Sequence, residues 1–352
     1  MAKSKFFGKD FITTADWKKE ELDQILTLAR EMREERYERP FTELLKHRTF
    51  FMFFYNPSVR TRQSFEAAAT ELGGHAQFLE PKTMRLKTKK KAGETVEDAA
   101  KVMSRYAVGI GIRILEDAIE KYGDGDALLR EYANYADVPI LNMADDKFHP
   151  FQGLADIMAL QDHFEEIRGK TVLVTWAHGA LARSWCSVQE HLLVASLYGM
   201  NIRLAYPEEY DLDPEVIKKV EKNCEENGSQ FEITHDPIKS YDGVHVVYSR
   251  NWMSHNAYGE EGFKKNEEIE KAMKYTEWIC TEEKMRRTKE AFFIHPMPVD
   301  RGHEVEDSVA SGEKSLIYEI AENRLHVQKS VMALLMSDLW DPDDLEKRNL
   351  GG

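Results

Sequence analysis

Several features that place a protein in a special class are missing from this sequence of 352 residues. It has no run of about 18 apolar residues and opens without an apolar stretch of signal-peptide length, so we expect neither a membrane span nor an export signal. Its three cysteines, Cys186, Cys224 and Cys280, follow no metal-binding or disulfide spacing. We therefore expect no metal site and a reducing, cytoplasmic location.

Positive charge is also scarce relative to negative charge. The formal net charge is −14 at pH 7, which argues against a general nucleic-acid partner. Any anion site must then be a local concentration of positive charge in a cleft. Hydrophobic residues make up 42% and charged residues 31% of the chain, which is typical of a globular protein with sizeable cores, and the length suits two domains.

The clearest local feature is the segment at residues 56–62. It follows an aromatic run at residues 50–55 that predicts a buried strand, and it precedes a helical run closed by a Gly-Gly pair. Helix N-termini bind anions because their first backbone N–H groups are unpaired. With Arg60 and Arg62 at this position, the segment predicts a phosphate or other anion cradle. An ordinary capped helix with solvent-facing arginines is the alternative.

Strand and helix patterns alternate in two successive sets along the chain. This alternation predicts an α/β protein with two doubly wound parallel-sheet lobes, one at residues 1–150 and one at 151–318, with a hinge near 149–156 and a cleft between the lobes. A last helix at about 319–340 is expected to pack back on the first lobe. Strands are expected at residues 50–55, 76–79, 108–112, 138–141, 171–176, 202–205, 231–234, 244–248 and 292–294, and helices at 14–36, 64–72, 94–103, 126–135, 153–164, 188–198 and 214–226.

Polar residues stand at three other places where a ligand could bind. Arg113 ends a predicted strand, where α/β sheets place ligand groups, although a surface salt bridge is the alternative. His149 and Gln152 lie one turn apart between a strand and a helix, where a lone histidine is more often a structural hydrogen bonder. The basic run at 82–91 is either a solvated loop or a mobile loop that delivers a lysine to an anionic ligand.

Taken together, these segments resemble one family, the carbamoyltransferases, which transfer a carbamoyl group from carbamoyl phosphate to an amine. The matching motifs are Ser-x-Arg-Thr-Arg at 58–62, Gly-Glu-Thr at 93–95, His-Pro-x-Gln at 149–152 and His-x-x-Pro at 295–298. The family's arginine after the third strand matches Arg113, and the closing segment resembles the ornithine branch. These matches keep the family's order along the chain. The resemblance therefore implies a carbamoyl phosphate-binding first domain and an acceptor-binding second domain.

The resemblance also implies roles for individual residues. Arg113 and His149 would polarise the carbamoyl carbonyl and stabilise the oxyanion, and Gln152 would hold the carbamoyl NH2 group. No metal or organic cofactor is implied. The implied catalytic residues are Arg60, Thr61, Arg113 and His149, and the implied carbamoyl phosphate ligands are Ser58, Val59, Arg60, Thr61, Arg113, His149, Gln152, His295, Pro296, Met297 and Arg324.

The family's assembly is a homotrimer with its catalytic sites between subunits, so the resemblance implies the same here. The loop after the second strand can reach into a neighbouring subunit's site in this family. In this chain the candidates for that reach are Lys87, Lys89, Lys90 and Lys91.

The acceptor amine is where this sequence departs from the family. Arg250 stands where enzymes acting on free ornithine have an aspartate, which disfavours free ornithine and suits a carboxylate on the acceptor. Pro296 replaces the cysteine of those enzymes and resembles the aspartate branch. We expect an ornithine-like or N-acylated amino acid; an aspartate-like or oxamate-like acceptor, or a catalytically weak anion-binding regulatory homologue, is the alternative. The acceptor-side candidates are Asn142, Lys147, Arg250, Trp252 and Arg301.

The connection after the strand at 171–176 is longer than in ornithine or aspartate enzymes. Its length resembles the family branch whose chain threads through a loop to form a knot, although the prolines of that loop are absent here. Knots are rare in proteins. A knotted second lobe is therefore a hypothesis that rests on this one resemblance.

Overall fold

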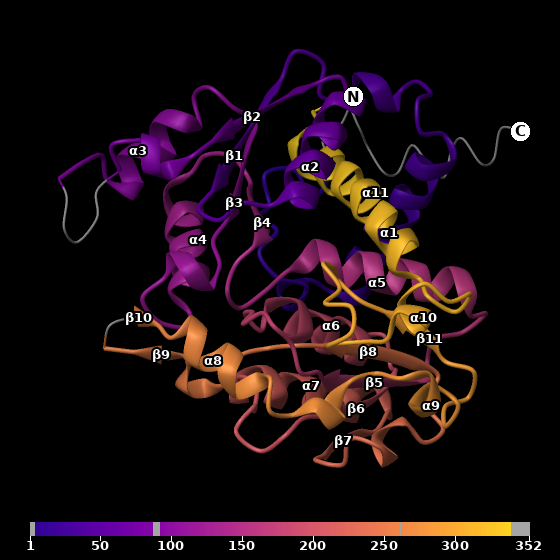
Figure 1. The fold of residues 1–352 in the computed structure, drawn as a ribbon. Coiled ribbons are helices and arrows are strands. Elements are labelled where there is room, and N and C mark those ends of the chain that lie inside the picture. Colours follow the sequence, from indigo (N-terminus) through magenta and orange to yellow (C-terminus); the bar gives the residue numbers. More distant parts are fainter. Residues whose placement is uncertain (1–3, 87–91, 261, 339–352) are drawn as a thin grey trace, which may run out of the picture. The chain divides into compact units, whose positions relative to one another are not determined.

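A computed structural model describes residues 4–86, 92–260 and 262–338 of the chain (Figure 1). The chain divides into two compact units. The first unit comprises Met1–Ala118, Gly123–Phe151 and Asn323–Gly352, and the second comprises Ile119–Tyr122 and Gln152–Glu322. Each unit is built on a parallel β-sheet, so the predicted α/β class with two parallel-sheet lobes is confirmed.

The sheet of the first unit has four parallel strands in the order β2-β1-β3-β4. Residues 50–54 of the central strand β1 are buried, as its apolar sequence predicts. Helices cover both of its faces: Phe50 packs on Phe65 of α2, and Phe53 on Tyr132 of α4. The strands are β1 (Thr49–Phe54), β2 (His75–Leu79), β3 (Gly109–Arg113) and β4 (Ile140–Ala144), and the helices are α1 (Lys19–Glu34), α2 (Val59–Glu71), α3 (Val96–Met103), α4 (Asp124–Tyr135) and most of α11 (Ile317–Met336).

The sheet of the second unit has five parallel strands in the order β11-β8-β5-β6-β7. Residues 186–196 of α6 are all buried, which fits the even spread of apolar residues around that helix. The strands are β5 (Thr171–Trp176), β6 (Asn201–Ala205), β7 (Phe231–Thr234), β8 (Val246–Arg250) and β11 (Phe292–Ile294), and the helices are α5 (Pro150–His163, from Gln152 on), α6 (Cys186–Leu197), α7 (Pro214–Asn227), α8 (Lys265–Ala272), α9 (Glu282–Met285) and α10 (Asp307–Ala310).

The predicted strands and long helices are present, with shifted ends. The largest shifts, of five residues each, are at the start of α1, which begins at Lys19 and not at residue 14, and at the start of α2, which begins at Val59 and not at residue 64. The short, polar elements α8, α9 and α10 and the pair β9 (Tyr258–Gly259) and β10 (Gly262–Phe263) were missed, because short charged segments carry little apolar periodicity. Single 3₁₀ turns lie at Thr14–Asp16, Phe41–Glu43, Pro81–Thr83, Glu116–Ala118, Lys239–Tyr241, His255–Ala257 and Thr276–Trp278.

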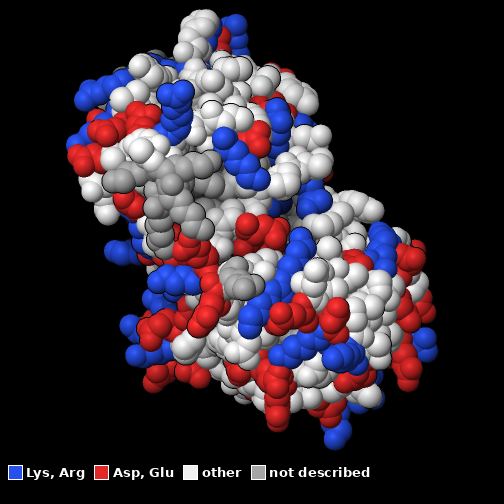
Figure 2. Space-filling model, turned by 60° about the vertical axis from the view of Figure 1, so that its left-hand side comes forward, with Lys and Arg blue, Asp and Glu red and all other residues white. Residues whose placement is uncertain are grey.

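The surface carries charges of both signs. Acidic and basic side chains are interspersed over the face seen in Figure 2. Within the described ranges, no helix is long and apolar enough to cross a membrane. The same residues form no group of three or more His, Cys, Asp and Glu side chains that could hold a metal ion.

The connection from β5 to α6 is fixed to later segments of the second unit. The Ala177 carbonyl accepts from the Asn251 side chain at 3.0 Å, and the Met253 backbone bonds both Arg183 and the Trp185 indole. These bonds fix the course of residues 177–185. The knotted course stays a prediction.

A buried ammonium group fastens α11 inside the first unit. Lys329 has no solvent exposure, and its Nζ donates to the Met32 and Arg36 carbonyls and to the Glu71 carboxylate at 3.0 Å. Burial lowers the pKa of Lys329, and Glu71 opposes that shift. Because one side chain satisfies acceptors on α1, on the residues after it and on α2, its loss removes a donor from the Met32 and Arg36 carbonyls and leaves Glu71 paired, among the described residues, with Arg36 alone.

We therefore expect Lys329→Met to lower the free energy of unfolding by about 3 kcal/mol. The measurement is the urea midpoint followed by circular dichroism. Lys101→Met is the matched control, because Lys101 forms an exposed pair with Glu97 on α3 and its loss should leave the midpoint unchanged. Equal midpoints for the two variants would show that Lys329 does not hold α11.

Candidate active site

The start of α2 has the geometry of an anion-binding helix end. Ser58 is the N-cap residue, in extended conformation, and its hydroxyl accepts from the Thr61 backbone N–H at 3.3 Å. Ser58 and Arg60 are half-buried, and Val59 is exposed. Helix N-termini carry a partial positive charge, and no acidic residue lies in the first turn of α2. The turn therefore has the polarity that a phosphate group requires.

Two arginines from other elements of the first unit lie at this turn. Arg324 of α11 is buried, and its Nη2 donates to the Thr61 hydroxyl at 3.1 Å. Arg113 ends β3 directly beside Phe54, the last residue of β1, and the backbones of Arg113 and Tyr55 are hydrogen-bonded at 2.9 Å. The parallel register thus places Arg113 at the edge of the sheet from which the Ser58 turn departs. Residues from three separate segments meet at one edge.

His149 stands at the end of a tightly bonded connection between β4 and α5. The Asp145 carboxylate accepts from the backbone of Lys147 at 2.7 Å and from the Asn142 side chain at 2.9 Å. Burial and the nearby Asp146 and Asp126 carboxylates raise the pKa of Asp145. His149 is buried immediately before Pro150, the first residue of α5. Asp145 is the residue that fixes this connection, and the sequence analysis did not single it out.

Three acceptor-side candidates have their side chains bonded elsewhere. The Asn142 amide donates to the Ile12 and Phe148 carbonyls and to Asp145, and its oxygen accepts from the Ala144 N–H. The Trp252 indole donates to the Tyr210 carbonyl inside an aromatic cluster. Arg301 Nη1 bonds Asp307 of α10 and Ser311 directly after that helix. The side-chain donors of Asn142 and Trp252 are thus used by protein groups, and all three residues stay predictions for the acceptor side.

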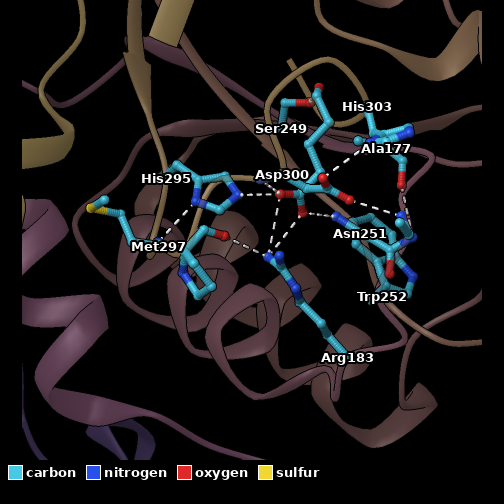
Figure 3. Close-up of polar contacts among 12 residues, drawn as sticks. Ala177, Arg183, Ser249, Asn251, Trp252, His295, Met297, Asp300 and His303 are labelled. Atoms are coloured by element: carbon cyan, nitrogen blue, oxygen red, sulfur yellow. Dashed lines mark hydrogen bonds and ion pairs between the residues drawn. The ribbon is translucent and has the colours of Figure 1, made fainter. Parts of the chain in front are cut away.

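In the second unit, the buried Glu304 carboxylate organises the loops after β5, β8 and β11 (Figure 3). It pairs with Arg183 at 3.1 Å and with His295 at 3.1 Å, and it accepts from the Asn251 and Asp300 backbone N–H groups at 2.8 Å. Burial raises the pKa of Glu304, but Arg183 and His295 outweigh burial and hold it well below its ordinary value. The sequence analysis did not single out Glu304.

His295 is held by its two ring nitrogens. Nδ1 accepts from the Met297 backbone N–H at 2.8 Å, so the proton of the neutral ring lies on Nε2 and points to Glu304. Burial lowers the His295 pKa from 6.5 to about 4, against the opposing effect of Glu304. The side chain of His295 therefore shapes the Pro296–Met297 loop. The predicted ligand role of His295 stays a prediction.

The Met297 backbone has the left-handed conformation, with φ at 57°. Arg183 donates to the Pro298 carbonyl at 2.9 Å, which fastens the loop to the connection after β5. Pro296 is buried, and Met297 is half-buried. The strained backbone is therefore held from both sides, by His295 and by Arg183.

Arg250 is a buried cation without a matching anion bonded to it. It ends β8 and is 7% exposed, and its Nε and Nη1 have no hydrogen-bond partner among the residues that the structure describes. Its charge helps to lower the pKa values of His295 and Glu304. A buried guanidinium with open donors is stabilised by a ligand carboxylate or phosphate.

The remaining candidates lie on two other segments. Gln152 is in the first turn of α5, fully buried, with Nε2 donating to Asp156 at 2.8 Å. Lys147 is half-buried, with its ammonium 5.6 Å from the centre of the Phe148 ring. The four lysines predicted to reach a neighbouring subunit, Lys87, Lys89, Lys90 and Lys91, lie outside the described residues.

The family models match both halves of the chain. Residues 9–162 match the model described as "Aspartate/ornithine carbamoyltransferase, carbamoyl-P binding domain", and residues 180–335 match "Aspartate/ornithine carbamoyltransferase, Asp/Orn binding domain". Among named proteins, the N-acetylornithine carbamoyltransferase of Xylella fastidiosa (strain Temecula1) is 34% identical, covering 94% of this chain and 99% of that protein. The ornithine carbamoyltransferase of Archaeoglobus fulgidus is 33% identical, covering 93% and 97%.

Solved structures give the same picture. An acetylornithine transcarbamylase complexed with acetylcitrulline superposes with a TM-score of 0.86 and 32% identity, covering 94% of this chain and 99% of that chain. A mutant of N-acetyl-L-ornithine transcarbamylase complexed with carbamyl phosphate and N-succinyl-L-norvaline has the same TM-score and identity, covering 93% and 99%.

The pKa of His295 predicts a pH-dependent stability. As the pH falls from 6.5 to about 4, the unfolded chain binds a proton that folded His295 does not, so stability is complete above this window and is lost within it. The loss is on the order of 3 kcal/mol. His295→Asn, whose side-chain oxygen can accept from Met297, should flatten the decline in urea-derived unfolding free energy. Parallel pH curves for wild type and variant would contradict this assignment.

Proposed function

Because the chain belongs to the aspartate/ornithine carbamoyltransferase family, we propose that it transfers the carbamoyl group of carbamoyl phosphate to the amino group of an N-acylated ornithine-like amino acid. The amine nitrogen attacks the carbamoyl carbon, the bond from that carbon to the phosphate oxygen breaks, and phosphate leaves with the proton of the amine. The observation that carries the proposal is the match to both family domains, with the motif residues for the donor in place.

Binding of the donor is assigned to the first unit. Carbamoyl phosphate carries a phosphate dianion, which suits the α2 N-terminus with Ser58, Val59, Arg60 and Thr61, assisted by Arg324. Arg113 would polarise the carbamoyl carbonyl from the same sheet edge. His149 would share this role. Hydrogen-bond donors aimed at the developing oxyanion usually make the largest single contribution to lowering the activation barrier.

Binding of the acceptor is assigned to the second unit, where Arg250 is the discriminating residue. The enzymes of this family that act on free ornithine have an aspartate at this position. A cation at that position repels a free α-ammonium group, whereas an N-acyl group removes that positive charge. The relatives named for N-acetylornithine support this choice. Arg250, whose Nε and Nη1 have no hydrogen-bond partner among the described residues, would then bind the carboxylate of the acceptor. Lys147 stays the acceptor-side candidate of the first unit.

Three further elements of the proposal rest on family resemblance. They are assembly as a homotrimer with sites between subunits, a cytoplasmic location, and a second-lobe loop at 295–297 that meets the carbamoyl group. Gln152 completes the donor site as the acceptor of a hydrogen bond from the carbamoyl NH2. An aspartate-like or oxamate-like acceptor is the second candidate function, favoured by Pro296 at the position where that branch also has proline.

The function is tested by incubating the protein with carbamoyl phosphate and a panel of acceptors while measuring phosphate release. The panel contains N-acetylornithine, N-succinylornithine, ornithine, aspartate, oxamate and putrescine. We expect turnover with an N-acylornithine and a kcat/KM for free ornithine lower by about two orders of magnitude, the equivalent of one misplaced charge. Arg113→Ala is the inactive control. Turnover of aspartate or oxamate alone would replace the proposed acceptor, and no turnover alongside carbamoyl phosphate binding would favour a regulatory homologue.

Replacing Arg250 separates the two substrates. Arg250→Gln keeps a polar amide but removes the charge and shortens the side chain, so kcat/KM for the acceptor should fall on the order of 10²-fold while the affinity for carbamoyl phosphate stays near the wild-type value. Arg286→Gln is the matched control, because Arg286 is exposed on the same unit. Steady-state kinetics and calorimetric titration provide the two readouts. Equal loss of donor and acceptor binding would contradict the assignment of Arg250 to the acceptor.

A further inference from the structure

Gln152 is the first of three buried polar side chains that form a hydrogen-bonded line in the second unit. Gln152 Nε2 donates to Asp156 Oδ1 at 2.8 Å, one turn further along α5. The other oxygen of Asp156 lies 3.0 Å from Nδ1 of His191 on α6. All three side chains are fully buried. Since burial of a carboxylate is costly, two donors aimed at its two oxygens form an arrangement that stabilises the ionised group.

This arrangement fixes which way the Gln152 amide faces. A carboxylate only accepts hydrogen bonds, so the amide must turn its NH2 group towards Asp156 and its Oε1 away from it. Gln152 Oε1 is buried and has no hydrogen-bond partner within the described ranges. A buried amide oxygen without a donor is an open position for a ligand N–H group.

His191 is held in turn by an aromatic ring. Its imidazole stacks on Tyr248 with ring centroids 4.6 Å apart and an interplanar angle of 28°. Tyr248 and Arg250 are two residues apart on β8, so they share one face of that strand. Tyr248, which packs against His191, and Arg250, the residue proposed to bind the acceptor, therefore lie on the same strand.

We propose that Asp156 and His191 are positioning residues that hold the Gln152 amide so that Oε1 accepts from the NH2 group of the carbamoyl donor. This inference rests on the proposed function and extends it. By holding the Gln152 amide, Asp156 and His191 give the site a preference for carbamoyl phosphate over acetyl phosphate. Acetyl phosphate has a methyl group in place of NH2 and cannot donate, so a correctly turned Gln152 discriminates against it.

The test compares the binding of carbamoyl phosphate, acetyl phosphate and inorganic phosphate by calorimetry, without an acceptor. Asp156→Asn supplies an NH2 group that can donate to Gln152 Oε1 and so allow the amide to rotate. We expect the ratio of the carbamoyl phosphate affinity to the acetyl phosphate affinity to fall at least about tenfold, with phosphate affinity unchanged, because phosphate does not contact Gln152. Asp162→Asn, at the exposed end of α5, is the matched control and should keep the ratio.

The neighbouring histidine provides a second, independent variant. His191→Phe keeps an aromatic ring against Tyr248 but loses the donor to Asp156, so the ratio should fall, whereas His191→Asn retains an N–H donor near the position of Nδ1 and should restore most of it. A purely structural role would lower thermal stability and weaken all three ligands alike, which would overturn the proposal. So would an unchanged ratio in Asp156→Asn.

The ratio of the carbamoyl phosphate affinity to the acetyl phosphate affinity also separates this inference from the proposed function on which it rests. If the wild type binds carbamoyl phosphate but turns over no acceptor, the proposed transfer fails while the affinity ratio still reports on Gln152. If the wild type transfers the carbamoyl group but does not distinguish acetyl phosphate from carbamoyl phosphate, the transfer stands and the positioning role is overturned.

Discussion

The ionised, buried carboxylate of Glu304 is the group on which the candidate acceptor side depends. An isolated carboxylate could not remain charged at this depth. It does so because Arg183, His295 and two backbone N–H groups share its oxygens, and these partners come from the three loops after β5, β8 and β11. The Glu304 carboxylate accepts from His295, whose other ring nitrogen holds the Met297 backbone, while burial keeps the His295 ring neutral against the opposing effect of Glu304. Glu304 and Arg183 pair with each other, whereas Arg250 interacts with Glu304 only through its charge, and its Nε and Nη1 have no hydrogen-bond partner among the described residues.

In the first unit, backbone register brings the candidate donor-side residues together. Parallel pairing of β1 with β3 places Arg113 beside the last residue of β1, and the chain then turns into the N-capped start of α2. No long-range ion pair is needed to bring Ser58 and Arg113 to one edge, because strand order alone does so. Arg324 is the exception. It comes from α11 and meets Thr61 across 263 residues of sequence, so the helix that closes the unit also completes its anion site.

Long-range side-chain pairing brings residues together in the second unit, and backbone register does so in the first. This difference explains how much could be predicted from the sequence. The strands, the long helices and the Ser58 turn follow from local apolar patterns and capping residues, which is why they were predicted with only their ends misplaced. The partners of Asn142, Trp252 and Arg301 could not be predicted, since no local pattern reveals whether a polar side chain bonds its own loop or faces a ligand. Glu304 was missed for the same reason: Arg183, its main partner, is 121 residues away.

The identity of the acceptor follows from charge more than from shape. Both ornithine and its N-acyl derivatives carry a carboxylate and a reactive δ-amine, so a pocket must tell them apart by the α-nitrogen, which is cationic in one and neutral in the other. A buried arginine makes that distinction strongly, because an unscreened like charge at short range costs several kcal/mol in a low-dielectric site. An apolar pocket for the acyl group would add only the smaller free energy of its buried carbon atoms. In the proposed function, electrostatic exclusion of the free amine is therefore the larger determinant, and the buried Arg250 is the residue proposed to supply it.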